Sequence, residues 1–178
     1  MERKNATYKM VMNSLFIVLS IVLSRILAIR IPLGNVEIIR FGFGTIPMFL
    51  AAFIFGPLDG FLVGAFADLI GYWINPMGAF LPQFTLTSAL HGLIPGLVFK
   101  YTFKKRINYW TLAVSCALGE LVGITLTPFF LNQAFGVPYA VLMPPRIGGY
   151  AVSFFLNPLI VLLIITRIPQ INRLLENK

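Results

Sequence analysis

Two acidic residues lie inside long apolar runs of the sequence, where an ionised carboxylate is costly to bury. Asp68 lies eight residues into the run 60–74, and Glu120 lies nine residues into the run 111–131. In hydrocarbon an unpaired charge costs at least about 2.5–3.5 kcal/mol, so each acid needs a partner or a proton. Two interpretations stay open for both: a buried structural pair, or recognition of donor groups on a buried ligand.

Arg146 is the next chemically informative residue, because it follows Pro144-Pro145 and precedes the apolar run 147–168. Proline is acceptable at the first positions of a helix, so this spacing predicts a helix that begins at Arg146. Tyr150 lies four residues later, on the same helix face. A guanidinium, a phenol and the exposed backbone N–H groups of a helix N-terminus would form an anion site. The alternative is an arginine that only reaches the membrane surface.

The other reactive residue types argue against enzyme chemistry. Cys116 is the only cysteine and His91 the only histidine, which excludes an internal disulfide, a cysteine metal cluster and a two-histidine zinc motif. The sequence also lacks a Gly-rich phosphate loop and a nucleophile–base pair in a recognisable context. We therefore predict no catalytic residue, no bound metal and no cofactor, and we expect His91 to be a core histidine.

The composition indicates an integral membrane protein. Of 178 residues, 58% are hydrophobic and only 11% are charged, with a mean hydropathy of +0.86, whereas a soluble domain is about a quarter charged. The net charge of +8 would suggest nucleic acid in a soluble protein. Here the basic residues lie mainly between apolar runs, so they report membrane topology and predict no nucleic-acid partner.

Six apolar runs predict an all-α bundle of six transmembrane helices in one membrane domain, 1–178. A bilayer core needs about 20 helical residues, and the second and third runs are shorter than that. They are either two short helices or one re-entrant hairpin; Gly56-Pro57 and the potential N-cap Asp59 favour two helices. The predicted spans lie at about 10–29, 43–55, 60–74, 84–101, 111–131 and 147–168.

Basic residues gather on one face of this six-span topology, which puts both termini in the cytoplasm by the positive-inside rule. The opposite face has three long loops, 28–42, 75–83 and 131–145, which are rich in proline and glycine yet apolar. Such backbone is tolerated near a membrane where protein covers it or where it lines a cavity. The loops therefore predict a lid over an outward-opening pocket. The residues on the cytoplasmic face are Arg3, Lys4, Lys9, Lys100, Lys104, Lys105, Arg106, Arg167, Arg173 and Lys178.

Several short motifs in the third and fourth runs and near Arg146 resemble the substrate-binding (S) components of energy-coupling factor (ECF) vitamin transporters, and most closely their folate-specific group. The resemblance covers nearly the whole chain. The motifs are GPLDG at 56–60, ADLIG at 67–71, PMGAFLP at 76–82, FTL at 84–86 and LMPPR at 142–146.

This resemblance implies a multi-pass protein of the bacterial plasma membrane that binds a vitamin near its outer face. It implies partners besides the lipid bilayer: a transmembrane coupling subunit and two ATPase subunits that power release of the vitamin. Small residues of the first span would form much of the docking surface for the coupling subunit. In this sequence these are Ser20, Ser24 and Ala28, which share one helical stripe.

Folate suits the residue types at the outer face. Its two carboxylates would meet an arginine, its flat pterin would stack on an aromatic ring, and its pyrimidine edge would donate to a buried carboxylate, best Asp68. The candidate substrate-binding residues are Arg146, Asp68, Tyr150, Phe84, Thr85, Arg30, Arg40, Trp73 and Tyr139.

Three alternatives stay open from the sequence. The cargo could be another vitamin, such as pantothenate or riboflavin; riboflavin lacks carboxylates, so the arginines would then be structural. The chain could instead be a membrane enzyme that acts on lipid or isoprenoid phosphates at Arg146, with Asp68 or Glu120 as the acid. It could also be an assembly protein that binds no small molecule.

Overall fold

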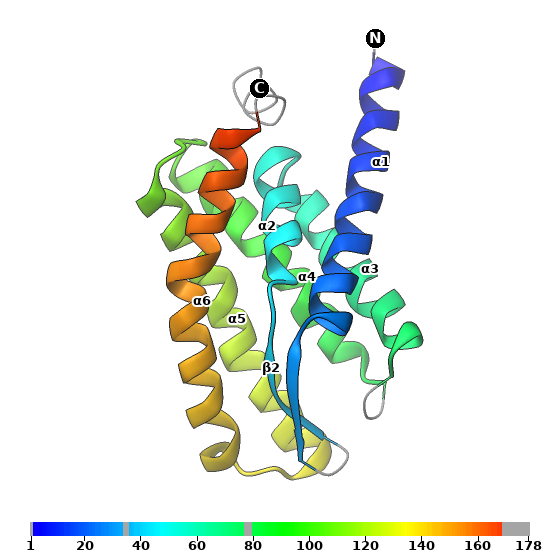
Figure 1. The fold of residues 1–178 in the computed structure, drawn as a ribbon, viewed down its shortest axis with the longest axis vertical. Coiled ribbons are helices and arrows are strands. Elements are labelled where there is room, and N and C mark those ends of the chain that lie inside the picture. The colour runs from blue at the N-terminus through cyan, green and yellow to red at the C-terminus, as the bar shows by residue number, and fades with distance from the viewer. Residues whose placement is uncertain (1, 34–35, 77–79, 169–178) are drawn as a thin grey trace.

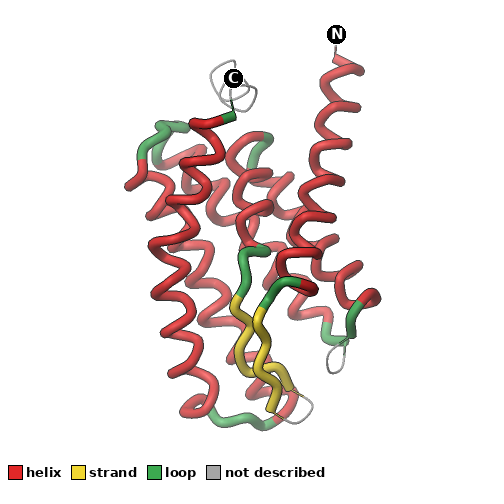
Figure 2. Tube along the Cα trace, viewed as in Figure 1, coloured by secondary structure: helices red, strands yellow, loops and turns green. Residues whose placement is uncertain are grey.

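The computed structural model describes the backbone of residues 2–33, 36–76 and 80–168, and the side chains of residues 6–28, 42–76 and 80–168. In these ranges the chain is mainly helical, with one pair of short strands after the first helix (Figures 1 and 2). The elements are α1 (Glu2–Ile21), a π-helical turn (Val22–Ile26), β1 (Ile29–Leu33), β2 (Val36–Phe41), α2 (Thr45–Ile54), α3 (Pro57–Ile74), α4 (Pro82–Leu97), a second π-helical turn (Val98–Thr102), α5 (Tyr109–Phe135) and α6 (Tyr139–Arg167).

The helices form a bundle with two distinct ends. The start of α1, the end of α6 and the α4–α5 connection lie at one end, which we call the basic end (Figure 1). The strand pair, the end of α3 and the α5–α6 connection lie at the other, which we call the hairpin end (Figure 2). In the described part, four helical segments are long and apolar enough to cross a membrane by length and composition: Ala6–Ile26, Pro57–Ile74, Tyr109–Phe135 and Tyr139–Arg167. The count of six spans therefore stays a prediction.

The second predicted span contains a helix only about half as long as a bilayer core is thick, because a strand pair precedes it in the chain. α2 has 10 residues and rises about 15 Å, half of a bilayer core. The segment before it is an antiparallel strand pair that places Arg30 opposite Arg40. The segment 29–41, which was expected to be an irregular loop, is thus a short strand pair within an otherwise helical bundle. Alternating Ile and Val residues around Gly34-Asn35 are a hairpin signal in this segment.

The sixth helix begins earlier than predicted. α6 starts at Tyr139 and includes Pro144 and Pro145, so the prediction that it begins at Arg146 was wrong. Internal proline costs a helix one hydrogen bond, but in a membrane the surrounding backbone groups still need internal partners, which a helix supplies. α5 ends at Gly136, whose φ of 66° is a left-handed cap. The outer loop expected at 131–145 is thus reduced to 136–138.

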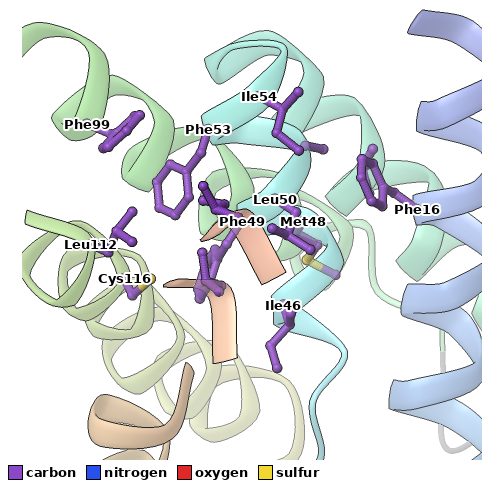
Figure 3. Close-up of a cluster of buried hydrophobic side chains, with 14 of the residues drawn as sticks. Phe16, Ile46, Met48, Phe49, Leu50, Phe53, Ile54, Phe99, Leu112 and Cys116 are labelled. Carbon is purple, nitrogen blue, oxygen red and sulfur yellow. The ribbon is translucent and has the colours of Figure 1, made fainter. Parts of the chain in front are cut away.

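α2 forms the centre of the core at the basic end. Every residue from Ile46 to Ile54 is buried, as expected of a helix that is apolar on all sides. Its Phe53 ring lies 4.7 Å from that of Phe99, centroid to centroid. Figure 3 shows this cluster, in which α2 side chains meet Leu112 and Cys116 of α5. The remaining long helices surround α2, so the basic half of the bundle is packed tightly around one short segment.

Candidate functional site

Four polar side chains from four different helices converge inside the bundle. The Nδ2 of Asn157 on α6 donates to Oε1 of Glu120 on α5 at 2.7 Å, and Nε2 of His91 on α4 lies 3.1 Å from Oε2. Thr45 at the start of α2 contributes its hydroxyl, 3.5 Å from Oε1 of Glu120 and 3.2 Å from Nδ2 of Asn157. Glu120, His91 and Asn157 are buried. We call these four residues the Glu120 cluster.

The Glu120 cluster lies at mid-depth because α2 starts there. Glu120 is the twelfth residue of α5, about 17 Å along the helix from its first residue. The N-terminus of the half-length α2 carries exposed backbone N–H groups and the positive end of the helix dipole, which favour a carboxylate beside it. Interrupted helices create ligand sites at mid-membrane in this way. The chain thus places a polar cluster where the hairpin ends and α2 begins.

Tyr150 adjoins this cluster, as the backbone around Gly123 shows. A Cβ atom added to Gly123 of α5 would overlap the Tyr150 hydroxyl and would lie 2.9 Å from Cε1 of His91. The phenol and the imidazole therefore meet against the same bare stretch of α5. With Tyr150 included, a carboxylate, an amide, an imidazole and two hydroxyls lie close together inside the bundle. This mixture of donors and acceptors suits the edge of a polar heterocycle.

Asp68 belongs to a second cluster, nearer the hairpin end. Its Oδ1 lies 2.9 Å from Nη2 of Arg25, and its Oδ2 accepts a hydrogen bond of 2.9 Å from Thr85. The Arg25 and Asp68 side chains are only 6% and 10% exposed. Gly71 leaves room for the arginine, because a Cβ there would lie 3.1 Å from Nε. Of the two interpretations of Asp68, the geometry supports the buried structural pair, and it brings the predicted residue Thr85 into that pair.

The predicted anion site at Arg146 does not include a helix N-terminus. Arg146 is the eighth residue of α6 and is half-buried, so the backbone N–H groups of the helix start lie about two turns away. Tyr150 remains on the same helix, one turn further, and faces α5 at Gly123. The guanidinium and the phenol of the prediction are therefore present on one helix, but the helix N-terminus is not part of the arrangement.

The predicted aromatic residues separate in the structure. Phe84 is half-buried and packs against Leu131 and Leu142, at the hairpin end of α5 and α6. Tyr139 is the first residue of α6 and is 42% exposed. Trp73 is 75% exposed and makes an edge contact with the neighbouring Tyr72, so it does not join either polar cluster.

Arg30 and Arg40 are opposite each other in the strand register, but their side chains lie outside the described residues. The hairpin that carries them packs against α6 through β2, on the hairpin side of the Glu120 cluster.

The predicted docking residues of the first helix are turned toward the rest of the chain. Ser20 is fully buried and donates to the carbonyl of Gly44 at 2.7 Å, and Ser24 is 6% exposed. Ala28 lies against Gly42, where an added Cβ would approach its own Cβ to 2.8 Å. The small residues therefore let α1 and the chain before α2 approach closely. Ser20 and Ser24 are buried in this structure, and their assignment to a docking surface stays a prediction.

Sequence reasoning missed part of the Glu120 cluster. His91 was interpreted as a core histidine, and Asn157 and Thr45 were not among the candidate site residues. Each is a polar residue within an apolar run, and that shared property was the available signal. Among the described residues, no group of three His, Cys, Asp or Glu side chains could hold a metal ion.

An apolar membrane bundle with a buried polar cluster at the interruption of one helix can bind a small polar molecule within the membrane. The chain matches the family described as ECF-type riboflavin transporter, S component, over residues 4–165 and therefore belongs to that family. The resemblance stated from the sequence motifs is thereby confirmed. The family is one of transporter components and not of enzymes.

Curated relatives carry the name of another vitamin. The chain is 35% identical over 152 residues to the folate transporter FolT of Clostridium novyi (strain NT), covering 85% of this chain and 84% of the relative. It is 30% identical over 116 residues to FolT of Leuconostoc mesenteroides subsp. mesenteroides, covering 65% and 58%. A crystal structure of FolT bound with folic acid has the same fold, with a TM-score of 0.73 at 23% identity over 90% of this chain and 93% of that one.

Proposed function

We propose that this chain is the folate-binding S component of an ECF-type transporter in a bacterial plasma membrane. The observation that carries the proposal is the 35% identity to a folate transporter over 85% of this chain. The buried Glu120 cluster supports it, because a vitamin with a polar heterocycle needs matched donors and acceptors in an otherwise apolar bundle. The chain binds the vitamin from outside and partner subunits supply the energy for its release.

The heterocycle of folate fits the Glu120 cluster. The pyrimidine edge of a pterin carries N–H donors beside a carbonyl acceptor, and Glu120 and Asn157 offer the complementary atoms. Hydrogen bonds to a charged partner are worth about 1.5–3 kcal/mol each. Asp68, our acceptor from the sequence, is held in an ion pair by the guanidinium of Arg25, whereas the partners of Glu120 are the side chains of Asn157, Thr45 and His91. We therefore assign the pterin edge to Glu120 and a positioning role to Asp68.

The rest of folate extends toward the hairpin end in this proposal. Phe84 and Tyr139 lie at that end of α4 and α6 and supply aromatic rings for the flat central part of the ligand. The two carboxylates of the glutamate tail are anions that arginine binds well. We assign three arginines as the partners of these carboxylates: Arg146 of α6, and Arg30 and Arg40, which are opposite each other in the strand register.

Docking to the coupling subunit uses the exposed face of α1. Val11, Leu15 and Val18 are 54%, 57% and 58% exposed and follow one another at helical spacing. We assign this row to the docking surface in addition to the predicted Ser20 and Ser24, and two ATPases acting through the coupling subunit complete the transporter. In this arrangement the helices cross the membrane six times and the basic end faces the cytoplasm.

Isothermal titration calorimetry on the purified chain in detergent tests the proposal. We expect folate to bind one-to-one without any partner subunit, and pantothenate not to bind. Riboflavin is the second candidate, because the family is described by that vitamin. Tight riboflavin binding without folate binding would retain the family and overturn the cargo. Absence of binding by all three would overturn the role as a vitamin-binding subunit.

A further inference from the structure

The α4–α5 connection carries a dense group of cations at the basic end of the bundle. Lys100, Lys104, Lys105 and Arg106 fall within seven residues, and all but the half-buried Lys105 are exposed. We call these four residues the basic loop. The connection between the π-helical turn that ends at Thr102 and the start of α5 is only six residues long. The charges therefore stay at the level where two helices end and do not extend into a soluble domain.

No acid among the described side chains neutralises the basic loop. The described acids are Asp59, Asp68 and Glu120, and each has its own partner. Asp59 accepts from Lys9 at 2.8 Å, Asp68 from Arg25 at 2.9 Å, and Glu120 lies 3.1 Å from the His91 imidazole. The basic loop therefore carries an excess of positive charge over the acids that the structure describes.

Exposed aromatic side chains within and just after the basic loop indicate that it lies at the headgroup level of a bilayer. Tyr101 and Trp110 are 66% and 67% exposed, and the ammonium group of Lys100 lies 5.1 Å from the centre of the Tyr101 ring. Exposed Trp and Tyr are enriched at the membrane–water interface, where their rings sit at headgroup level. Lys100, which contacts the Tyr101 ring, would therefore lie at the level of the lipid phosphates.

The backbone of the loop gives an independent reason to regard its charges as functional. Lys104 and Lys105 have φ angles of 48° and 60°, a left-handed conformation that costs a side-chain-bearing residue about 1 kcal/mol. Hydrogen bonds from the N–H of Lys105 to the carbonyl of Phe99 and from Arg106 to Phe103, both 3.0 Å, hold this turn. Glycine or asparagine would adopt it more readily, so conformational stability does not explain the two lysines, whereas their charge does.

We propose that the basic loop, together with Tyr101 and Trp110, is a binding site for the headgroup of anionic phospholipid, such as phosphatidylglycerol. Charge complementarity selects the lipid: each basic residue near a membrane surface gains about 1 kcal/mol from anionic headgroups. The site anchors the end of α4 and the start of α5 at the interface. It is independent of vitamin binding, which lies at mid-depth and toward the hairpin end.

The two tryptophans of the chain provide a matched pair of probes for this proposal. Trp110 borders the basic loop, and Trp73 is exposed near the end of α3, which lies at the hairpin end of the bundle. The variant Trp73→Phe reports from Trp110 alone, and Trp110→Phe reports from Trp73 alone. Each is placed in nanodiscs of equal phosphatidylglycerol and phosphatidylcholine, with bromine on the acyl chains of one lipid or the other. Quenching of fluorescence then reports which lipid lies nearest.

Charge variants complete the test. In the Trp73→Phe background, Lys100→Gln, Lys104→Asn, Lys105→Asn and Arg106→Gln remove the charges while asparagine tolerates the left-handed turn. The control replaces the three lysines by arginine. Monodisperse elution, and folate affinity measured with Trp73 retained, check that the variants fold.

We expect brominated phosphatidylglycerol to quench Trp110 at least about twofold more than brominated phosphatidylcholine. This preference should vanish in the neutralised variant, persist in the arginine variant and be absent at Trp73. Equal quenching of Trp110 by the two lipids would overturn the proposal, as would a preference that survives neutralisation. Loss of assembly with the coupling subunit, without any lipid preference, would also overturn it and assign the loop to a protein contact.

Discussion

The guanidinium Nη2 of Arg25, at the end of the first helix, lies 2.9 Å from Oδ1 of Asp68 in the middle of α3. Four residues further along the chain, β1 begins, so this ion pair fixes the point from which the hairpin extends. At the other end of α1, Lys9 and Asn13 hold Asp59 at the start of α3 at 2.8 and 2.7 Å. Two polar contacts nine residues apart on α3 thus fix α1 along its length.

Replacing Asp68 by Asn should destabilise the protein more than it weakens vitamin binding. Removing one partner of a buried ion pair leaves the other charge uncompensated and costs about 3 kcal/mol. We expect a lower unfolding temperature in detergent, and partial recovery in the double variant Arg25→Met, Asp68→Asn, in which no unpaired charge remains. A large loss of folate affinity at unchanged unfolding temperature would contradict this and return Asp68 to the ligand.

Replacing Glu120 by Gln should reduce folate affinity at least about tenfold, which corresponds to 1.4 kcal/mol. The amide retains the volume of the side chain but loses the charge that strengthens its hydrogen bonds. Calorimetry measures the affinity, and unfolding temperature reports on the fold. Thr125→Val is the control, because Thr125 lies on the same helix, is exposed and bonds only to its own helix carbonyls. Equal affinities for the two variants would contradict the assignment.

The seam between α3 and α4 should not tolerate a methyl group. A Cβ on Gly92 would overlap the backbone carbonyl of Gly60, and backbone cannot rotate away as a side chain can. We expect Gly92→Ala to lower stability by about 1–3 kcal/mol, the usual range for overpacking. Gly148→Ala on α6 is the control, because nothing lies within 4 Å of its Cβ and alanine favours the helix by about 0.5–1 kcal/mol. Equal unfolding temperatures would contradict this close approach.

The helices could be predicted because membrane spans are long apolar runs. The conformation of the segments between them at the hairpin end could not be predicted in the same way. Proline at 144 and 145 led us to begin the sixth helix at Arg146, but the structure continues helically from Tyr139. Local proline chemistry was outweighed by the need of backbone groups in a membrane for internal partners. The strand pair at 29–41 had a readable signal, since alternating β-branched residues surround Gly34-Asn35.

The candidate site was predictable as a set of residue types and not as a set of contacts. Asp68 and Glu120 were identified as buried acids from their place in apolar runs. Which of them pairs with an arginine depends on where α1 ends against α3, and no sequence spacing reports that distance. Asn157 and Thr45 meet Glu120 from helices 37 and 75 residues away along the chain, so only the tertiary arrangement could reveal them.

The exposed row on α1 should govern assembly with the coupling subunit and leave vitamin binding intact. Leu15→Trp adds bulk to a side chain that is 57% exposed and far from both polar clusters. We expect it to reduce co-purification with the coupling subunit and the ATPases several-fold, while folate affinity of the isolated chain stays unchanged. Leu121→Trp is the matched control, because Leu121 is 49% exposed on α5 and keeps the same apolar surface toward lipid. If both variants assemble as well as the unmodified chain, the docking surface lies elsewhere; if Leu121→Trp alone fails, it lies on α5.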